Sequence, residues 1–258
     1  MKSLIIRAIS GLFIVLLTIF MISKGGILAA LFIFLLSIIG IREFFDAIEN
    51  KGVKPIKGIG YISCIGFLFY SLDFKWVSLI YIFIFVIIAL IFNFIYKKDI
   101  NFIDSIATIF GILYIPFLME HIIYLDGTIY IWLIFIIAWG TDTFAYLSGS
   151  LFGKTKLCPK LSPKKTVEGS LGGILGAIIL TLIYAKYFGV FPVWKFVLLS
   201  LIGSIIAQIG DLTASKIKRL TGIKDFGFIM PGHGGVLDRF DSILFTAPFI
   251  YYFVNFFL

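Results

Sequence analysis

Nine predominantly apolar runs follow one another along this chain of 258 residues. A helix needs about 20 apolar residues to cross the hydrocarbon core of a bilayer. We therefore predict an all-α, polytopic integral membrane protein with about nine transmembrane helices. The predicted helices cover residues 4–22, 26–45, 58–72, 76–96, 103–124, 129–150, 169–188, 192–213 and 236–257.

The composition excludes an ordinary soluble domain. The chain is 60% hydrophobic and only 14% charged, and its mean hydropathy is +1.09, whereas soluble domains are about 25% charged. The third run is short and the fifth contains Pro116, which removes a helical hydrogen bond. For these two helices a tilted, a kinked and a re-entrant path all remain open.

Lysine and arginine predict the orientation, because they concentrate in cytoplasmic loops. With a cytoplasmic N-terminus, eighteen of the 22 basic residues lie in cytoplasmic loops or at the adjacent helix ends. We therefore expect a protein of the cell membrane whose N-terminus and functional site face the cytoplasm. The net charge of +8 then reflects these loops and anionic lipid headgroups, and we expect no nucleic-acid partner.

Ionisable residues are costly at membrane depth unless they are paired, hydrated or bound to a metal. The N-terminal half contains few of them, and we interpret these as solvated helix ends. They are Glu43, Asp46, Glu49, Asp104 and Glu120. Residues 1–100 are therefore predicted to be a scaffold of transmembrane helices. Residues 101–258, with cytoplasmic loops at 151–168 and 214–236, are predicted to be the functional part of one continuous membrane domain.

Two aspartates of the later runs stand out. Asp142 lies well inside the sixth run, where it either hydrogen-bonds to a neighbouring helix or lines a polar cavity open to the cytoplasmic side. Asp211 lies near the end of the eighth run, and helical spacing places Ser215 and Lys218 on its face. Arg219 follows directly. A carboxylate, a hydroxyl and cations on one surface suit a metal and a phosphate together.

The stretch KDFGFIMPGHGGVLDRFDS, residues 224–242, joins the last two runs. Its proline and glycines predict an irregular backbone that brings amide groups close to a ligand. Asp238 and Asp241 lie three residues apart on one helical face, where they either favour the helix dipole or bind a metal. Carboxylates suit magnesium, and zinc is disfavoured because the chain has only two histidines and no cysteine nearby.

The predicted loop at 151–168 carries a basic run that is stiffened by two prolines. Its lysines are Lys154, Lys156, Lys160, Lys164 and Lys165, and Glu168 follows them. These lysines are either ordinary residues of a cytoplasmic loop or countercharges for a polyphosphate or a phospholipid headgroup.

The string SKIKRLTGIKDFGFIMPGHGGVLDRFD, residues 215–241, resembles the signature of the CDP-diacylglycerol synthases, also called phosphatidate cytidylyltransferases. SPKKTVEG and DTFAY are similar to further motifs of that family, and together these motifs cover the C-terminal half. Three positions depart from the family pattern. Ala214 replaces a common glutamate, Val167 a common tryptophan, and Met230 another aliphatic residue or phenylalanine. The first departure removes a carboxylate that would support the metal ligands.

The resemblance implies a magnesium-dependent nucleotidyltransferase of phospholipid biosynthesis, acting as a homodimer in the bilayer. Its substrates would be CTP and phosphatidic acid, and its products CDP-diacylglycerol and pyrophosphate. The resemblance also implies that Asp211 and Asp238 are the principal metal ligands, with Asp241 as a third ligand or an orienting group.

The remaining candidates take their roles from the same resemblance. The side chains expected to hold phosphates are Lys218, Arg219, Lys224 and Arg239. The glycine loop with His233, Gly234 and Gly235 is expected to approach the nucleotide, and Ser215 and Asp225 are expected to bind substrate. Those expected on the side where lipid enters are Asp142, Lys164, Lys165 and Glu168. With the three aspartates, Lys224 is expected to act in catalysis.

An ion-coupled secondary transporter with a cytoplasmic-side polar site is the alternative from another functional class, because intramembrane acids and broken helices also mark ion pathways. Such sites lie near the midplane, whereas the costly residues of this chain crowd toward one face of the membrane. An alcohol phosphotransferase that consumes CDP-diacylglycerol is disfavoured, since its pattern of spaced aspartates is missing.

Overall fold

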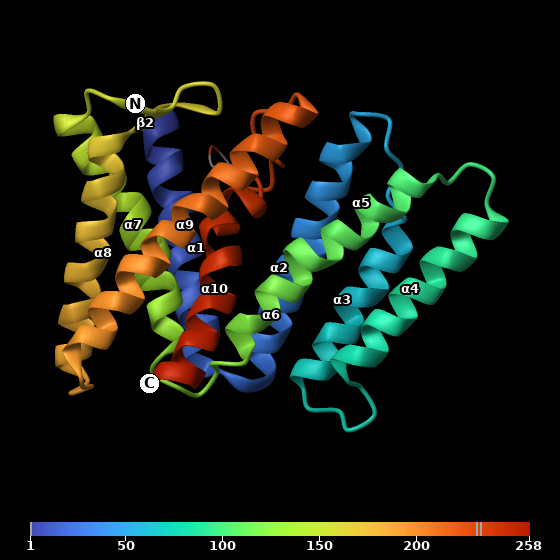
Figure 1. The fold of residues 1–258 in the computed structure, drawn as a ribbon, viewed down its shortest axis with the longest axis horizontal. Helices are drawn as coiled ribbons and strands as arrows, with labels where there is room; N and C mark the ends of the chain where they lie inside the picture. The colour runs from blue at the N-terminus through green and yellow to red at the C-terminus, as the bar shows by residue number, and fades with distance from the viewer. Residues whose placement is uncertain (1, 231, 233) are drawn as a thin grey trace. The chain divides into compact units, whose positions relative to one another are not determined.

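The computed structural model describes residues 2–230, 232 and 234–258, with side chains from residue 10 onward (Figure 1). Its chain divides into two compact units. The first comprises Met1–Gly127 and Leu220–Arg239, and the second comprises Thr128–Arg219 and Phe240–Leu258. Within the described residues, seven helices are long and apolar enough to cross a membrane. This confirms the prediction of an all-α, polytopic membrane protein.

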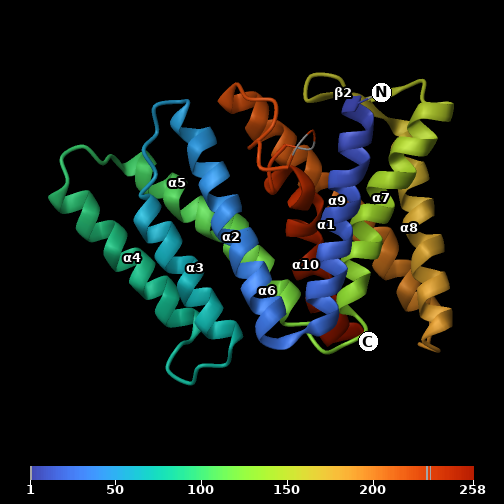
Figure 2. The same ribbon diagram turned by 180° about the vertical axis from the view of Figure 1, so that it is seen from behind.

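The first unit contains the helices of the first five predicted runs. They are α1 (Lys2–Lys24), α2 (Gly26–Glu49), α3 (Lys57–Ser71), α4 (Leu79–Tyr96), α5 (Phe102–Ile112), the π-helical turn η1 (Leu113–Phe117) and α6 (Leu118–Ile123). Helices α3 and α4 lie side by side in both views (Figures 1 and 2). The third run is indeed a short helix, of 15 residues.

The fifth run shows what Pro116 does. The proline lies in η1, so the helix changes from α to π geometry and back within one continuous span, Phe102–Ile123. A proline lacks the N–H of the i→i−4 bond and its ring clashes with the carbonyl of residue i−4, and the π-helical turn is the local departure from α geometry at this point. The proline therefore interrupts the α-helical ladder without ending the span.

The packing of the first unit is organised around Phe45 of α2, which is fully buried. A Cβ atom built on Gly60 of α3 or on Gly111 of α5 would lie 2.6 Å from the Phe45 ring. These glycines therefore let α3 and α5 approach α2 closely. Glu43, on the same helix, is buried as well, at 5% exposure.

Asp104 and Glu120 are buried as well, at 1% and 4% exposure, so the interpretation of Glu43, Asp104 and Glu120 as solvated helix ends is wrong. Asp104 accepts hydrogen bonds from the backbone N–H groups of Lys54, at 2.6 Å, and Asn101, at 2.8 Å. A buried carboxylate is tolerated where such donors replace its water.

The interpretation is right for Asp46 and Glu49. Both lie near the end of α2, and the Lys57 ammonium contacts the Asp46 carboxylate at 2.7 Å and the Glu49 carboxylate at 2.9 Å. The carboxylates are partly exposed, so this ion-pair cluster is screened by solvent and contributes little to stability.

The second unit contains the later helices and a small hairpin. Its elements are α7 (Ile131–Phe152), β1 (Lys156–Cys158), β2 (Ser162–Thr166), α8 (Val167–Tyr187), and most of α9 (Val193–Thr221) and α10 (Leu237–Phe257). The end of α9 from Leu220 and the start of α10 up to Arg239 belong to the first unit. The strands pair antiparallel, with Lys156 opposite Thr166 and Cys158 opposite Ser162. The predicted loop at 151–168 is therefore largely a β-hairpin. Helix α9 continues through Thr221, so the connection to α10 covers residues 222–236 rather than 214–236.

Helices α7 and α8 pack side by side through glycines of α8 (Figure 1). A Cβ atom built on Gly173 would lie 2.8 Å from the carbonyl oxygen of Thr141, and one built on Gly169 would lie 2.8 Å from that of Ala145. Spacing of four residues puts both glycines on one helical face, which is the small-xxx-small arrangement of membrane helices. Because Asp142 follows Thr141, this contact also fixes the position of Asp142.

Candidate active site

Three carboxylates of the second unit come from three different helices: Asp142 from α7, Asp211 from α9 and Asp241 from α10. Helices α9 and α10 almost touch beside them, since a Cβ atom on Gly210 would lie 2.6 Å from the carbonyl oxygen of Asp241. The charges of Asp211 and Asp142 both act on Asp241. The structure thus brings together three acids that are up to 99 residues apart in the sequence.

Hydrogen bonds between the helices hold this group in place. The Ser242 hydroxyl donates to the Asp142 carboxylate at 3.0 Å, and the Thr141 hydroxyl donates to Ser204 of α9 at 2.8 Å. Of the two alternatives for Asp142, the hydrogen bond to a neighbouring helix is therefore present. The same bond holds Asp142 next to the residue that follows Asp241.

Basic and hydroxyl groups surround Asp211. The ammonium of Lys165, on β2, forms an ion pair with the Asp211 carboxylate. The Ser215 hydroxyl donates to the same carboxylate at 3.4 Å. This is the contact between helical neighbours that the spacing of four residues predicts. The charge of Lys218 acts on Asp241. Cations and acids therefore lie together at this end of α9, and such a set of charges can bind a phosphate with its counterion.

The hairpin is attached to its surroundings by backbone groups. The Glu168 carboxylate accepts hydrogen bonds from the Thr155 N–H at 3.1 and 3.2 Å, and the Arg219 Nε donates to the carbonyl oxygen of Leu161 at 3.5 Å. Glu168 thus has a structural bond in addition to its predicted role. Lys164 is exposed, whereas Lys165 is half-buried beside Asp211.

In the first unit, Asp238 organises the connection between α9 and α10. Its Oδ2 atom accepts hydrogen bonds from the backbone N–H groups of Phe226, at 2.7 Å, and Gly235, at 2.9 Å. Gly234 has a φ of +86°, and a Cβ atom there would lie 2.6 Å from the same oxygen. The glycine is required on both grounds. The amide groups of this connection approach the Asp238 carboxylate, and their predicted approach to a ligand remains a prediction.

The other predicted residues of this connection have different surroundings. Asp225 lies against Gly234, whose Cβ atom would be 3.2 Å from that of Asp225, and Lys224 is exposed. The Arg239 Nε is buried and has no hydrogen-bond partner among the described residues. His233 lies outside the described residues.

Glu43 is a residue of this region that the sequence reasoning missed. Its carboxylate accepts hydrogen bonds from the backbone N–H groups of Val236 and Leu237, at 3.0 and 2.9 Å. A signal was present in the sequence, because Glu43 falls inside the predicted run 26–45 and not beyond its end. An acid at that depth needs a partner.

The donor chemistry fits magnesium better than it fits any softer metal, because the acids offer hard oxygens and no cysteine lies among them. No group of three or more histidine, cysteine, aspartate or glutamate residues in the described part of the chain has the geometry of a metal site. Lys165 neutralises Asp211 in this arrangement. The magnesium site, and the convergence of Asp211 with Asp238, remain predictions.

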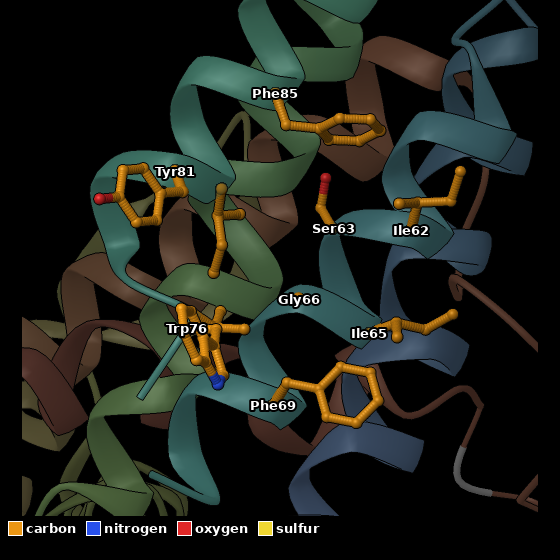
Figure 3. Close-up of a pocket in the computed structure, with 10 residues that line it drawn as sticks. Ile62, Ser63, Ile65, Gly66, Phe69, Trp76, Tyr81 and Phe85 are labelled. Carbon is orange, nitrogen blue, oxygen red and sulfur yellow. The ribbon is translucent and has the colours of Figure 1, made fainter. Parts of the chain in front are cut away.

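A cavity of about 300 Å³ lies between α3 and α4. Its lining residues come from another part of the sequence than the charged residues described above. Figure 3 shows that its walls are aromatic and aliphatic, with Phe69, Trp76, Tyr81 and Phe85 among them. Its lining lacks charged side chains, so it is not the polar cavity expected from the sequence, which also remains a prediction.

The sequence that forms these acids, lysines and the glycine-rich connection is similar to that of a known protein family. The model of the cytidylyltransferase family matches residues 5–257. The chain belongs to this family. The family motif in residues 215–241 covers the end of α9, the connection and the start of α10.

Curated relatives of this cytidylyltransferase support the assignment along nearly the whole chain. The phosphatidate cytidylyltransferase of Staphylococcus epidermidis is 34% identical over 254 residues, which cover 95% of this chain and 96% of the relative. That of Staphylococcus saprophyticus is 34% identical over 240 residues, with 88% and 90% covered. That of Staphylococcus aureus is 33% identical over 237 residues, with the same coverage.

Proposed function

We propose that this chain is a phosphatidate cytidylyltransferase, which transfers CMP from CTP to phosphatidic acid and releases pyrophosphate. The observation that carries the proposal is the family match over residues 5–257, together with relatives named phosphatidate cytidylyltransferase that align over 95% of the chain. The cluster of acids and lysines in the second unit supports it, because this cluster has the charges that the reaction needs.

The reaction joins two anions. The phosphate of phosphatidic acid attacks the α-phosphate of CTP, and the pyrophosphate leaves with its negative charge. Repulsion between the reactants and charge on the leaving group therefore make up much of the barrier, and positioned cations lower it. No separate general base is needed, because a phosphate monoester is already ionised near neutral pH.

The charged side chains of the candidate site would then have distinct roles in this reaction. Lys165 and Lys218 would hold phosphate oxygens beside Asp211 and Asp241. The further cations proposed to bind phosphates are Arg219, Lys224 and Arg239. Asp142, Lys164 and Glu168 are proposed to line the side where lipid enters, and Ser215, Asp225, His233, Gly234 and Gly235 to line the nucleotide.

We propose magnesium as the cofactor, held by Asp211 and Asp241, with Asp238 as a further ligand one helical turn before Asp241. Bound magnesium would screen the phosphate charges and favour departure of pyrophosphate. The Asp238 Oδ2 already accepts two N–H bonds, and a carboxylate has about four acceptor positions, so its other oxygen suffices for a metal.

Sidedness and assembly belong to the same proposal. The lysine-rich hairpin and the connection between α9 and α10 would face the cytoplasm of a cell membrane, because basic residues concentrate there and CTP is a cytoplasmic nucleotide. The resemblance further suggests a homodimer. Cross-linking of the purified protein in lipid nanodiscs, followed by mass measurement, tests the dimer, and a monomeric mass alone would contradict it.

The experiment that tests the function uses CTP labelled at its α-phosphate, phosphatidic acid and magnesium with the purified chain in detergent. Label should appear in a lipid that co-migrates with CDP-diacylglycerol, and one pyrophosphate should form per labelled lipid. Omission of phosphatidic acid is the control. No labelled lipid from folded protein would overturn the proposal, and coupled ion uptake into proteoliposomes would favour the transporter, which no comparison supports.

A further inference from the structure

The Glu43 carboxylate caps the N-terminus of a helix that begins 194 residues later in the chain. Its Oε1 atom accepts from the Val236 N–H and its Oε2 atom from the Leu237 N–H, and Leu237 is the first residue of α10. The first N–H groups of a helix have no partner within the helix. A carboxylate there satisfies two of them and also favours the helix dipole.

The connection before α10 packs tightly around this carboxylate. A Cβ atom built on Gly227 would lie 2.4 Å from Oε1 of Glu43, and one built on Gly235 would lie 2.3 Å from it. No side chain fits at either position while the carboxylate stays in place. The backbone of the connection is therefore held against Glu43 at two points that are eight residues apart.

Asp238 also accepts hydrogen bonds from the backbone of the connection. Its donors are the N–H groups of Phe226 and Gly235. The two carboxylates together therefore accept hydrogen bonds from Phe226 and from the three consecutive residues 235–237. Both acids are buried, at 5% exposure for Glu43 and 7% for Asp238. Movement of the Glu43 carboxylate would thus release Val236 and Leu237, the residues that precede Asp238.

We propose that Glu43 is a positioning residue for the proposed cytidylyl transfer, an inference that rests on that proposed function. Its two hydrogen bonds fix the direction of the first turn of α10, which carries Asp238 and Arg239. An N-cap serine or aspartate next to the helix would stabilise it equally well. A cap supplied by α2 has a further effect, because it ties the orientation of Asp238 to an N-terminal helix of the same unit.

The variant Glu43→Gln tests this directly. Glutamine has almost the same volume, but its amide nitrogen would face one of the two N–H donors, so one hydrogen bond is lost and replaced by repulsion. Glu49→Gln is the matched control, since Glu49 lies on the same helix and only forms an exposed ion pair with Lys57. Gly227→Ala is the second variant, because its methyl group displaces the carboxylate without changing any charge.

Three measurements on the full chain in nanodiscs separate positioning from stability. They are kcat and KM in the labelled-CTP assay, hydrogen exchange of peptides covering residues 226–237, and the thermal unfolding temperature. We expect Glu43→Gln and Gly227→Ala to lower kcat about tenfold to a hundredfold, since a misplacement of about 1 Å costs that much. Exchange over 226–237 should accelerate at least about tenfold, and the KM for phosphatidic acid should stay close to that of Glu49→Gln. The lost buried hydrogen bond should lower the unfolding temperature, but kcat should also fall in protein that is still folded at the assay temperature.

Each outcome decides the question. A kcat within about twofold of the parent, or unchanged exchange over 226–237, would overturn the inference. So would a loss of activity that merely follows the loss of folded protein across the variants. If the parent itself made no labelled lipid, the proposed function would fail, whereas the exchange measurement would still show whether Glu43 holds the connection.

Discussion

Lys165 of the hairpin forms an ion pair with Asp211 of α9. The side chains are 26% and 23% exposed, so solvent screens the pair only in part. The pair fastens the hairpin to α9 and keeps a cation beside the acids of the second unit. Both partners are also proposed to bind ligands, and therefore their pairing has to loosen or be shared when a phosphate and a metal arrive.

Replacing Lys165 by alanine should weaken substrate binding more than it weakens folding. The change removes the cation beside Asp211, and we expect the KM for CTP or phosphatidic acid to rise about tenfold, because a charge-assisted phosphate contact contributes about 1.5–3 kcal/mol. Lys160→Ala is the matched control, since Lys160 is exposed on the same hairpin. Unchanged KM and kcat in Lys165→Ala would remove this lysine from the site.

Removing the metal or its ligands should stop turnover while the protein stays folded. Chelation with EDTA should abolish labelled-lipid formation and magnesium should restore it. Asp211→Asn and Asp241→Asn should each lower kcat about a hundredfold or more, as expected when charge stabilisation at the reacting phosphates is lost. Asp46→Asn, an exposed acid of α2, should not. Turnover at the parental rate across magnesium concentrations in both site variants would refute the metal assignment.

Gly210→Ala should separate α9 from α10 at the site. Its Cβ atom would lie 2.6 Å from the carbonyl oxygen of Asp241, and backbone cannot yield as a side chain can. We expect a loss of about 1–3 kcal/mol in the free energy of unfolding from overpacking, together with reduced kcat. The unfolding temperature and the labelled-CTP assay measure the two effects.

Gly203→Ala is the control for that experiment. Gly203 lies on the same helix, and the three atoms nearest to its Cβ atom would belong to side chains, the nearest being a methyl group of Ile137 at 3.1 Å. A small shift of that side chain accommodates the methyl group. Equal effects of the two substitutions on stability and activity would contradict the importance of the backbone contact at Asp241.

Asp104→Ala should destabilise the first unit. The substitution leaves the N–H groups of Lys54 and Asn101 without their acceptor and removes the capping box of α5. The expected loss is about 1–3 kcal/mol, the usual cost of unsatisfied buried donors. Denaturant unfolding in mild detergent measures it, with Asp99→Ala in the exposed preceding loop as the control. Equal stability of the two variants would show that Asp104 is not a structural acid.

Much of the fold follows from local properties of the sequence. All nine predicted runs are helical, because a backbone in lipid must satisfy its own hydrogen bonds and a span needs about 20 apolar residues. Pro116 marks the interruption in the fifth run, and the spacing of Asp211 and Ser215 gives their contact on α9. The motif in residues 215–241 likewise indicates the family that the comparison shows.

The roles of individual acids were decided by the tertiary structure. Hydropathy assigns each residue a cost of burial by itself, whereas the actual cost depends on donors that distant segments supply. Glu43 is buried because Val236 and Leu237 bring their N–H groups to it, and Asp142 meets Ser242 only because α7 and α10 pack together. The sequence therefore determined which segments are helices, and only their packing determined which charges have partners.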